Sequence, residues 1–277
     1  MSQNRTLVIV VTYNSMRWID RCLTSVRESS VEADVAVVDN ASQDGICAYI
    51  EKSYPGVILF RNDTNIGFGT ANNKAMKYAL EQGYDYVYLL NVDASLMKDT
   101  LEILIEEQQA HPEFGVISPM QLEANKTHLD SLFAHFIGIE KGYVDASYFG
   151  SAQTLFPLRF IMAAHWLISR ECLQKVGGFS PSFFMYGEDD NYCDRVRYHG
   201  LKVGFSTRAK AVHDREDRPR DKAKRLFVEN AHRIVDMSSL SGRHRSLFEC
   251  LCSCVTSAVK DSSLQPLKYI PGLVCSY

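Results

Sequence analysis

The chain has 277 residues, of which 46% are hydrophobic and 23% charged, a composition typical of a folded protein with a sizeable core. Its formal net charge of −3 argues against a general nucleic-acid-binding protein, because such proteins usually carry a strong basic excess. No apolar run approaches the ~20 residues of a membrane-spanning helix, and the N-terminus lacks the pattern of a secretory signal.

The first half of the sequence alternates strand and helix patterns. Near-continuous apolar runs predict four buried strands, at 7–12, 34–39, 57–60 and 86–91. Helical patterns follow them at 16–29, about 42–54, 70–82 and 98–110. This alternation predicts an α/β fold with a Rossmann-like, mostly parallel sheet flanked by helices.

The second half is less regular. Residues 114–160 mix glycine, serine, histidine and aromatic residues, which predicts short strands and loops. Beyond them we expect strands at 160–169 and 202–214, a short helix ending at Gly177-Gly178, and a helix at 189–198. From residue 215 the sequence is charged and helical, with a second amphipathic stretch at 246–259.

Polar residues stand at the end of each of the four strands of the first half. They are Thr12 to Asn14, Asp39-Asn40, Asn62-Asp63 with the loop Asn65 to Gly69, and Asn91 to Asp93. One such cluster alone is more often a turn or a helix cap. Because parallel strands place their carboxyl ends at one edge, where open α/β sheets bind ligands, the four together predict a ligand site.

The glycine-rich stretch GFGTAN (67–72) does not fit a dinucleotide-binding motif. It reads Gly-x-Gly-x-x-Asn and follows the third strand, whereas the fingerprint follows the first strand. A hydride-transferring Rossmann enzyme is therefore disfavoured.

Six segments, taken in order, resemble the motifs of one enzyme family: VVTYNS (10–15), VVDNASQDG (37–45), NIGFGTANN (65–73), LLNVD (89–93), VGGFSPSFFMYGEDDNYCDR (176–195) and AVHD (211–214). They are similar to those of inverting nucleotide-sugar glycosyltransferases of family two, which have the GT-A fold, and rhamnosyltransferase-like members are the most similar. The resemblance implies metal-dependent transfer, with inversion, from a dTDP-rhamnose or UDP-sugar type of donor. The implied acceptor is a saccharide or lipid-linked glycan in cell-surface polysaccharide synthesis.

The resemblance also implies roles for the donor-side residues. Thr12, Asn14 and Asp39 match positions that hold the nucleobase, and an ionised carboxylate is a strong acceptor for a base N–H. Asn65 and Gly67 match the loop that closes over the nucleotide.

A divalent cation, Mg²⁺ or Mn²⁺, is implied by the segment Asn91-Val92-Asp93, which matches an Asp-x-Asp motif. Asn91 departs from that motif. Because an amide binds a ribose hydroxyl better than it binds a hard cation, Asp93 is the main expected metal ligand. His213 matches a histidine that completes the metal or diphosphate site, although a lone strand-end histidine is usually structural.

On the acceptor side, Glu188-Asp189 matches the family's Glu-Asp pair, which makes Asp189 the implied general base and Glu188 a substrate-binding residue. First-turn acids are also favoured by a helix dipole, which would tend to keep Asp189 ionised. Arg195 matches a structural or phosphate-side partner. Trp166, next to His165, is assigned to the acceptor pocket, with core packing as the equal alternative.

We divide the chain into a catalytic domain at 1–214, with a nucleotide-binding part to about 112, and a helical extension at 215–277. The extension is expected to pack on the catalytic domain, form a homodimer or lie on a membrane surface. The eight cysteines show no zinc or disulfide pattern, so we expect reduced thiols and a cytoplasmic protein, with peripheral contact at the membrane's cytoplasmic face as an alternative.

Two other functions compete. A non-catalytic nucleotide-sugar-binding protein would explain Asn91 but has no use for Asp189. A nucleotidyltransferase would need an N-terminal glycine-rich loop with lysine or arginine, which this sequence lacks.

Overall fold

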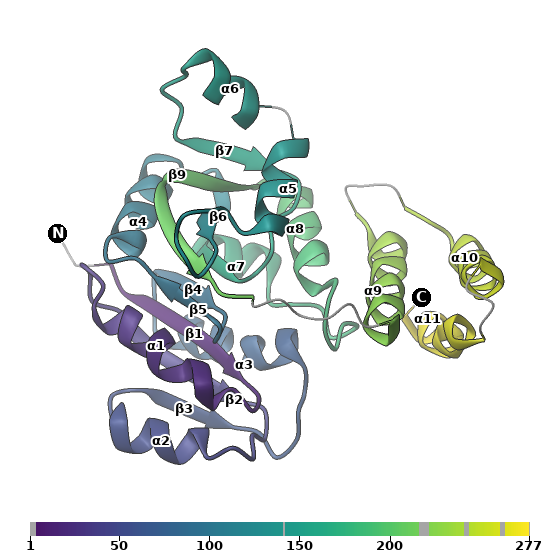
Figure 1. Cartoon of the computed structure of the whole chain (residues 1–277), viewed down its shortest axis with the longest axis horizontal. Helices are drawn as coiled ribbons and strands as arrows, with labels where there is room; N and C mark the ends of the chain where they lie inside the picture. Colours follow the sequence, from purple (N-terminus) through teal and green to yellow (C-terminus); the bar gives the residue numbers. More distant parts are fainter. Residues whose placement is uncertain (1–3, 141, 216–221, 241–243, 261–263, 277) are drawn as a thin grey trace.

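A computed structural model describes residues 4–140, 142–215, 222–240, 244–260 and 264–276. One sheet with strand order β3-β2-β1-β4-β8-β6-β9-β5 runs through the molecule, and β7 pairs with β9 beside it (Figure 1). Helices cover both faces of this sheet, so the α/β class expected from the sequence is confirmed.

The first half follows the predicted alternation closely. Its elements are β1 (Thr6–Thr12), α1 (Met16–Arg27), β2 (Asp34–Asp39), α2 (Ile46–Ser53), β3 (Ile58–Arg61), α3 (Phe68–Glu81), β4 (Tyr86–Leu90), β5 (Ala94–Leu96) and α4 (Thr100–Ala110). Strands β3, β2, β1 and β4 are all parallel. Alternate residues of β1 face opposite sides: Leu7 and Ile9 pack under α3, whereas Val8 and Val10 pack under α1.

The second half contains β6 (Phe114–Leu122), α5 (Ser131–Ile139), α6 (Tyr143–Phe149), β7 (Leu155–Leu158), β8 (His165–Ser169), α7 (Arg170–Val176), α8 (Glu188–Tyr198) and β9 (Lys202–His213). Strand β8 runs antiparallel to both β4 and β6. This reversal brings the beginning of β8 to the edge where β4 ends, with Leu90 beside His165.

The expectation of only short strands and loops at 114–160 was wrong. Strand β6 spans nine residues and is buried along nearly all its length, although it carries Ser118, Pro119 and Gln121. The buried amide of Gln121 donates to the Ser118 hydroxyl (3.1 Å), and Pro119 lies at a register shift against β9. Helix α5 begins where the Asp130 carboxylate accepts from the Phe133 N–H (2.8 Å).

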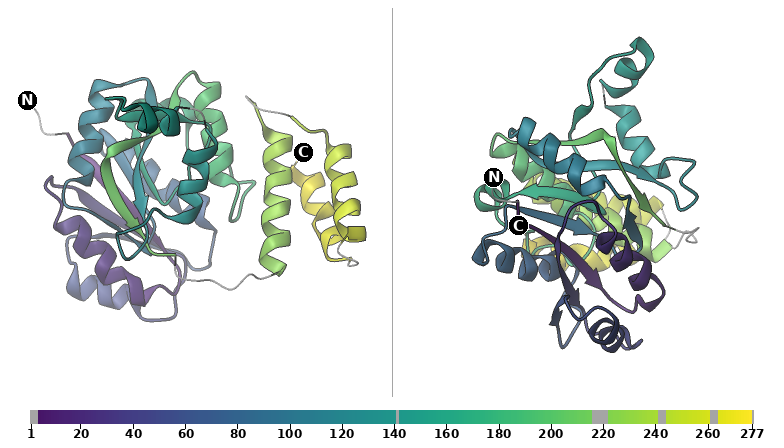
Figure 2. Two further views of the ribbon diagram at one scale, coloured as in Figure 1. Left: turned by 45° about the horizontal axis from the view of Figure 1, so that its top comes forward. Right: turned by 90° about the vertical axis from the view of Figure 1, so that its left-hand side faces the viewer.

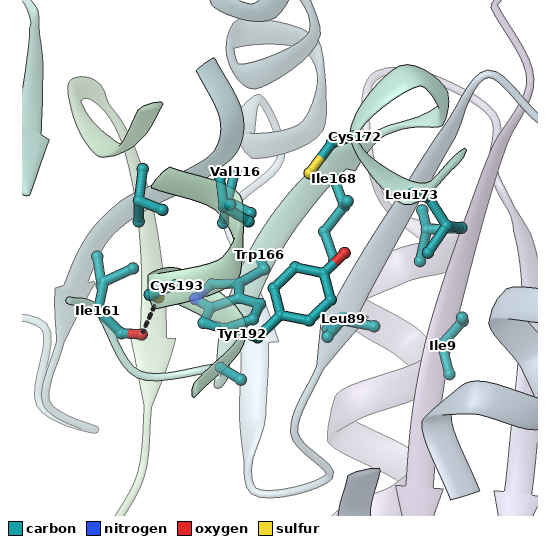
Figure 3. Packing of buried hydrophobic residues seen from close by; sticks show 14 of the residues in the cluster. Ile9, Leu89, Val116, Ile161, Trp166, Ile168, Cys172, Leu173, Tyr192 and Cys193 are labelled. Atoms are coloured by element: carbon teal, nitrogen blue, oxygen red, sulfur yellow. Dashed lines mark hydrogen bonds between the residues drawn. The ribbon is translucent and has the colours of Figure 1, made fainter. Parts of the chain in front are cut away.

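The strand predicted at 160–169 is shorter than expected, because only His165–Ser169 pairs in the sheet. The residues just before His165 are buried but do not pair in the sheet. Among them, the Ile161 carbonyl accepts a hydrogen bond from the Cys193 thiol (3.8 Å; Figure 3). This irregular stretch joins β7 to β8 beneath α8.

The tail forms α9 (Lys222–Ser238), α10 (Leu247–Lys260), the 3₁₀ helix η1 (Gln265–Tyr269) and α11 (Ile270–Ser276). These helices gather beside α8, at one end of the molecule (Figure 2). They share a small apolar core of Ile234, Val235, Cys250, Cys254 and Leu273, and Phe183 from the segment before α8 joins it. The expected helical tail is therefore present in the described residues, whereas residues 216–221 lie outside them.

Helix α9 also contacts α8 through polar groups. The Asn191 amide donates to Ser238 (3.2 Å), and the Asp194 carboxylate accepts from the Leu240 N–H (2.6 Å). No helix within the described ranges has the length and apolar character needed to cross a membrane. All eight cysteines, each within those ranges, carry free thiols.

Candidate active site

The polar ends of the first four strands come together at one edge of the sheet, as their parallel pairing requires. Thr12 and Asp39 are register partners, and the Thr12 hydroxyl donates to the Asp39 carboxylate (2.8 Å). The buried Asn40 side chain joins the second cluster to the third: it donates to the Gly67 carbonyl (3.3 Å) and accepts from Asn62 (2.9 Å). Hydrogen bonds therefore connect the first three clusters to one another.

Asp39 is almost fully buried, and its carboxylate is held as an anion. Burial alone raises its pKa, but hydrogen bonds from the Ser42 hydroxyl (2.6 Å), the Ser42 N–H (2.9 Å) and the Thr12 hydroxyl outweigh burial, so the pKa lies below its usual value. Oδ2 accepts only one of these three bonds. The Cys47 thiol is a fourth donor to this carboxylate, so hydrogen bonds within the protein account for its ionised state.

We predict that Asp39→Ala weakens nucleoside-diphosphate binding by roughly 1.5–3 kcal/mol, the usual contribution of a hydrogen bond to a charged group. Ser42→Ala is the control, because it removes one internal donor, the Ser42 hydroxyl, but keeps the Ser42 N–H and the Asp39 carboxylate. Isothermal titration of both folded variants gives the answer. An unchanged affinity in Asp39→Ala would remove this residue from the nucleotide site.

Asn14 and Asn65 hold the loops of this edge. Asn14 adopts a left-handed backbone (φ 49°), and its side-chain oxygen accepts from the Gln43 N–H (2.8 Å). The side-chain oxygen of Asn65 accepts from the Gly67 N–H (3.0 Å). Both amides thus shape the loops, and their contact with a nucleotide stays a prediction.

Gly67 locks its loop onto the segment before α8. Its φ is +83°, and a Cβ at this position would collide with the carbonyl of Phe184, which accepts from the Phe68 N–H (3.1 Å). Only glycine meets both requirements. The donor-side loop and the acceptor-side segment are therefore in direct contact.

A left-handed backbone alone costs an L-residue ~1–2 kcal/mol. We expect Gly67→Ala to destabilise the fold by more than this, because the collision of the new methyl group with the Phe184 carbonyl adds to that cost. Gly56→Ala is a matched control: it has open space around the new methyl group and an ordinary φ. Urea unfolding of both variants measures the difference. Equal midpoints for the two variants would contradict the contact with Phe184.

Asp93 and His213 lie together where β4 and β9 end. The Asp93 carboxylate is 3.7 Å from His213 Nε2, and both side chains are largely buried. On the other side of the ring, His213 Nδ1 is 3.6 Å from the Asp130 carboxylate. The same Asp130 oxygen accepts a shorter hydrogen bond from Arg215 Nε (2.6 Å), so Asp130, which the sequence analysis did not single out, lies between His213 and Arg215.

A carboxylate and an imidazole suit a divalent cation that is also held by substrate phosphates and water. In the described part of the chain, no group of three or more His, Cys, Asp or Glu side chains could hold a metal by itself. The donor set therefore fits a cation shared with a diphosphate and does not fit a closed structural site. Asn91 lies at the same strand end, and its backbone N–H donates to the Ala164 carbonyl (3.0 Å).

Asp189 and Glu188 open helix α8. Burial, and next the charge of Asp190, raise the pKa of Asp189 to about 6, while N–H groups of Asp190 (3.0 Å) and Ala163 donate to its carboxylate. Burial, and next the charge of Asp189, raise the pKa of Glu188 to about 8. The helix dipole thus does not offset burial, and the pKa of each carboxyl lies above its usual value.

The backbone of Ala163-Ala164 connects these acids to the donor edge. Ala163 donates to Asp189, and Ala164 accepts from Asn91. Two adjacent residues before β8 thus hold the end of β4 on one side and the first turn of α8 on the other. No side-chain pattern marked this connection, because it runs through main-chain atoms.

The pocket assignment of Trp166 was wrong. Its side chain has no exposed surface and stacks on Phe179 (centroids 6.0 Å apart) and beside Tyr192 (5.6 Å), deep in the core (Figure 3). Neighbouring His165 is equally buried between the Tyr88 hydroxyl (2.9 Å) and the Val212 carbonyl (3.1 Å), and burial lowers its pKa to about 4. The core-packing alternative therefore applies to both side chains.

Of the two roles expected for Arg195, the contacts support the structural one. Its guanidinium donates to the carbonyls of Val176 (2.7 Å) and Gly178 (2.6 Å) and to the Asn191 side chain (3.1 Å). These acceptors are at the end of α7 and on α8. Arg195 on α8 therefore links this helix to the end of α7 through hydrogen bonds.

Comparison with known proteins identifies the family. The model of the family "Glycosyl transferase family 2" matches residues 7–177, more than half of the chain. The chain belongs to glycosyl transferase family 2. This match confirms the predicted glycosyltransferase class and includes all four strand-end clusters, whereas α8 and β9 lie beyond it.

Two curated proteins and one solved structure show what this chain is similar to. The low-salt glycan biosynthesis hexosyltransferase Agl10 of Haloferax volcanii is 24% identical over 215 residues, covering 75% of this chain and 66% of its own, so the chain spans just under two thirds of that protein. The N-acetylglucosaminyl-diphospho-decaprenol L-rhamnosyltransferase of Mycobacterium tuberculosis is 24% identical over 264 residues. The match covers 86% of this chain and 84% of that protein. The solved structure of a mannosyltransferase from Pyrobaculum calidifontis, in complex with GDP-Man and Mn²⁺, is 18% identical in sequence and has a TM-score of 0.65. The match covers 99% of this chain and 74% of that chain.

Proposed function

We propose that this family 2 glycosyltransferase is metal-dependent and transfers one sugar, with inversion, from a nucleoside-diphosphate sugar. The proposed donor is of the dTDP-rhamnose or UDP-sugar type, and the acceptor is a saccharide or a lipid-linked glycan of a cell-surface polysaccharide. The names of the mycobacterial and haloarchaeal relatives support this choice, since one is a rhamnosyltransferase on a lipid diphosphate and the other acts in glycan biosynthesis.

One observation carries the proposal: a partly exposed carboxylate with a raised pKa is tied, through Ala163-Ala164, to the strand end that carries Asp93. A base is useful only when it lies near both the acceptor hydroxyl and the bond that breaks. A protein that merely binds a nucleotide sugar has no need of such a group. The geometry therefore favours transfer over binding alone.

In the proposed mechanism, Asp39 and Thr12 position the nucleobase, with Asn14, Asn65, Gly67 and Asn91 contributing the surrounding loop and ribose contacts. Asp93 and His213 would hold the cation, which would neutralise charge on the leaving diphosphate. Asp189 takes the proton from the acceptor hydroxyl as its oxygen attacks the anomeric carbon from the face opposite the diphosphate. Glu188, whose pKa is also raised by burial, lies beside it in the first turn of α8.

We further propose that residues 1–214 form the catalytic domain and that 215–277 are an extension which supports α8. The contacts of α9 with Phe183, Asn191 and Asp194 support this division of roles. A cytoplasmic location with peripheral membrane contact would suit a lipid-linked acceptor.

A thermal-shift panel tests the donor class. The full chain is heated with UDP, dTDP and GDP and their sugars, with and without Mg²⁺ or Mn²⁺. We expect one nucleoside diphosphate to raise Tm, and the cation to increase that rise, because a ligand that binds only the folded state stabilises it. A panel without any response, or a response independent of the cation in every case, would contradict the proposal.

A further inference from the structure

A cavity of about 270 Å³ lies between α9 and α10, away from the sheet edge described above. Four cationic side chains line it: Arg225, Arg233, Arg245 and Lys260. Two carboxylates, Glu229 and Asp236, face the same space, so the lining carries two more positive than negative charges. A chain with a net charge of −3 thus concentrates positive charge at one place.

Arg233 is the central cation of this cavity, since only 4% of it is exposed. Its Nη2 donates to Ser257 (2.9 Å), its Nε donates to Ser253 (3.2 Å), and the Glu229 carboxylate is 3.7 Å away. Its Nη1, although buried, has no hydrogen-bond partner among the described residues. A buried charged donor without an acceptor is costly, so the site is built for an additional oxygen ligand.

The cavity opens towards an apolar surface. A second hollow, of about 810 Å³, shares Arg245 and Lys260 with the first and extends to Phe248 and Cys252. On α10 these two are followed by Val255 and Val259, at steps of four, three and four residues, so the four side chains form one stripe along the helix. All four are exposed, Phe248 and Val259 each by 75%.

This stripe is additional to the face that α10 uses for packing. Cys250, Cys254 and Ala258 are buried against the neighbouring helices, which leaves the exposed stripe without a partner in the described residues. Helix α10 is therefore apolar on two sides, with a cationic cavity at the border of the exposed one.

We propose that this cavity binds the phosphate of an anionic lipid headgroup, with the stripe of α10 lying in the boundary between headgroups and acyl chains. A phosphate supplies several acceptor oxygens for Arg233 and its cationic neighbours, and the adjoining stripe accounts for the apolar part of the ligand. A symmetric second copy fits less well, because two-fold pairing over this face would bring two equal cationic cavities together. The proposal does not depend on the transferase reaction.

Co-sedimentation of the full chain with vesicles tests the proposal. We expect binding to phosphatidylcholine vesicles that contain phosphatidylglycerol and little binding to phosphatidylcholine alone. Lys260→Gln should weaken the partition coefficient about fivefold, the usual effect of one lysine near an anionic surface. Phe248→Ser, at a well-exposed position, should weaken it as well.

Lys77→Gln is the matched control, because it removes the same charge from an exposed site on α3 and should leave partitioning unchanged. Equal binding to neutral vesicles, or equal weakening by Lys77→Gln and Lys260→Gln, would overturn the proposal. If the chain binds inorganic phosphate in calorimetry but does not sediment with either kind of vesicle, the cavity binds a soluble phosphate and the lipid proposal is overturned. A stable dimer in light scattering that Phe248→Ser dissociates would assign the stripe to a second copy.

Discussion

Asp189→Asn is expected to lower kcat by about 10²–10⁴-fold, the usual contribution of a general base, while donor affinity stays nearly unchanged. The amide cannot take the proton of the acceptor hydroxyl, but it keeps the shape of the first turn of α8. Paired measurements of glycosyl transfer and calorimetric donor binding give the two quantities. An active variant would remove Asp189 from the role of base.

Two controls separate loss of the base from damage to the helix. Asp190→Asn should reduce turnover much less, since a one-residue step turns the side chain by roughly 100° around the helix. Because burial raises the pKa of Asp189 to about 6, the wild-type rate should fall as pH drops through about 6. The same raised pKa makes the ionised carboxyl destabilising above pH 6, so Asp189→Asn should unfold at no lower temperature than wild type at pH 8.

Asp93→Ala is expected to abolish the cation-dependent part of donor binding. The remaining imidazole of His213 would be a poor ligand for a hard cation without the carboxylate. Nucleotide affinity measured with and without Mn²⁺ gives the cation-dependent part directly. Asn91→Ala should retain most of it, because the backbone N–H that bonds Ala164 is unaffected.

The relative loss of cation-dependent binding in Asp93→Ala and Asn91→Ala decides which residue of the Asn-x-Asp segment is the main metal ligand. If Asn91→Ala loses cation dependence and Asp93→Ala keeps it, the metal assignment is reversed. Asp63→Ala, at an exposed carboxylate on the loop after β3, controls for a general loss of negative charge near the edge.

The first half of the fold was predictable because its strands are buried on both faces and therefore appear as uninterrupted apolar runs. The predicted strand at 34–39 matches β2 residue for residue. Strand β6 was missed because it buries the polar residues Ser118 and Gln121, whose mutual hydrogen bond inside the sheet the apolar pattern does not show. Helix α6 presents no buried residue, so no periodic apolar face indicated it.

The site was predictable to the extent that parallel strands bring their ends together. Neither the reversed direction of β8 nor its pairing with β4 was visible in the sequence, and these place Trp166 in the core. The sequence left two roles open for Arg195, because its acceptors are carbonyl groups at the end of another helix, which no sequence pattern indicates. Asp130 gave no functional signal, because capping α5 fully accounts for an aspartate at that position.

The contacts between α3 and the segment before α8 have a consequence for building hybrid enzymes. Gly67 leaves room for the Phe184 carbonyl, and the Asn73 side chain forms two hydrogen bonds with the backbone of Phe179 (2.7 and 2.9 Å). A Cβ on Gly178 would strike Asn73. A graft that exchanges the acceptor segment between two parents must therefore carry residues 67–73 from the same parent, since the two stretches form one transferable unit.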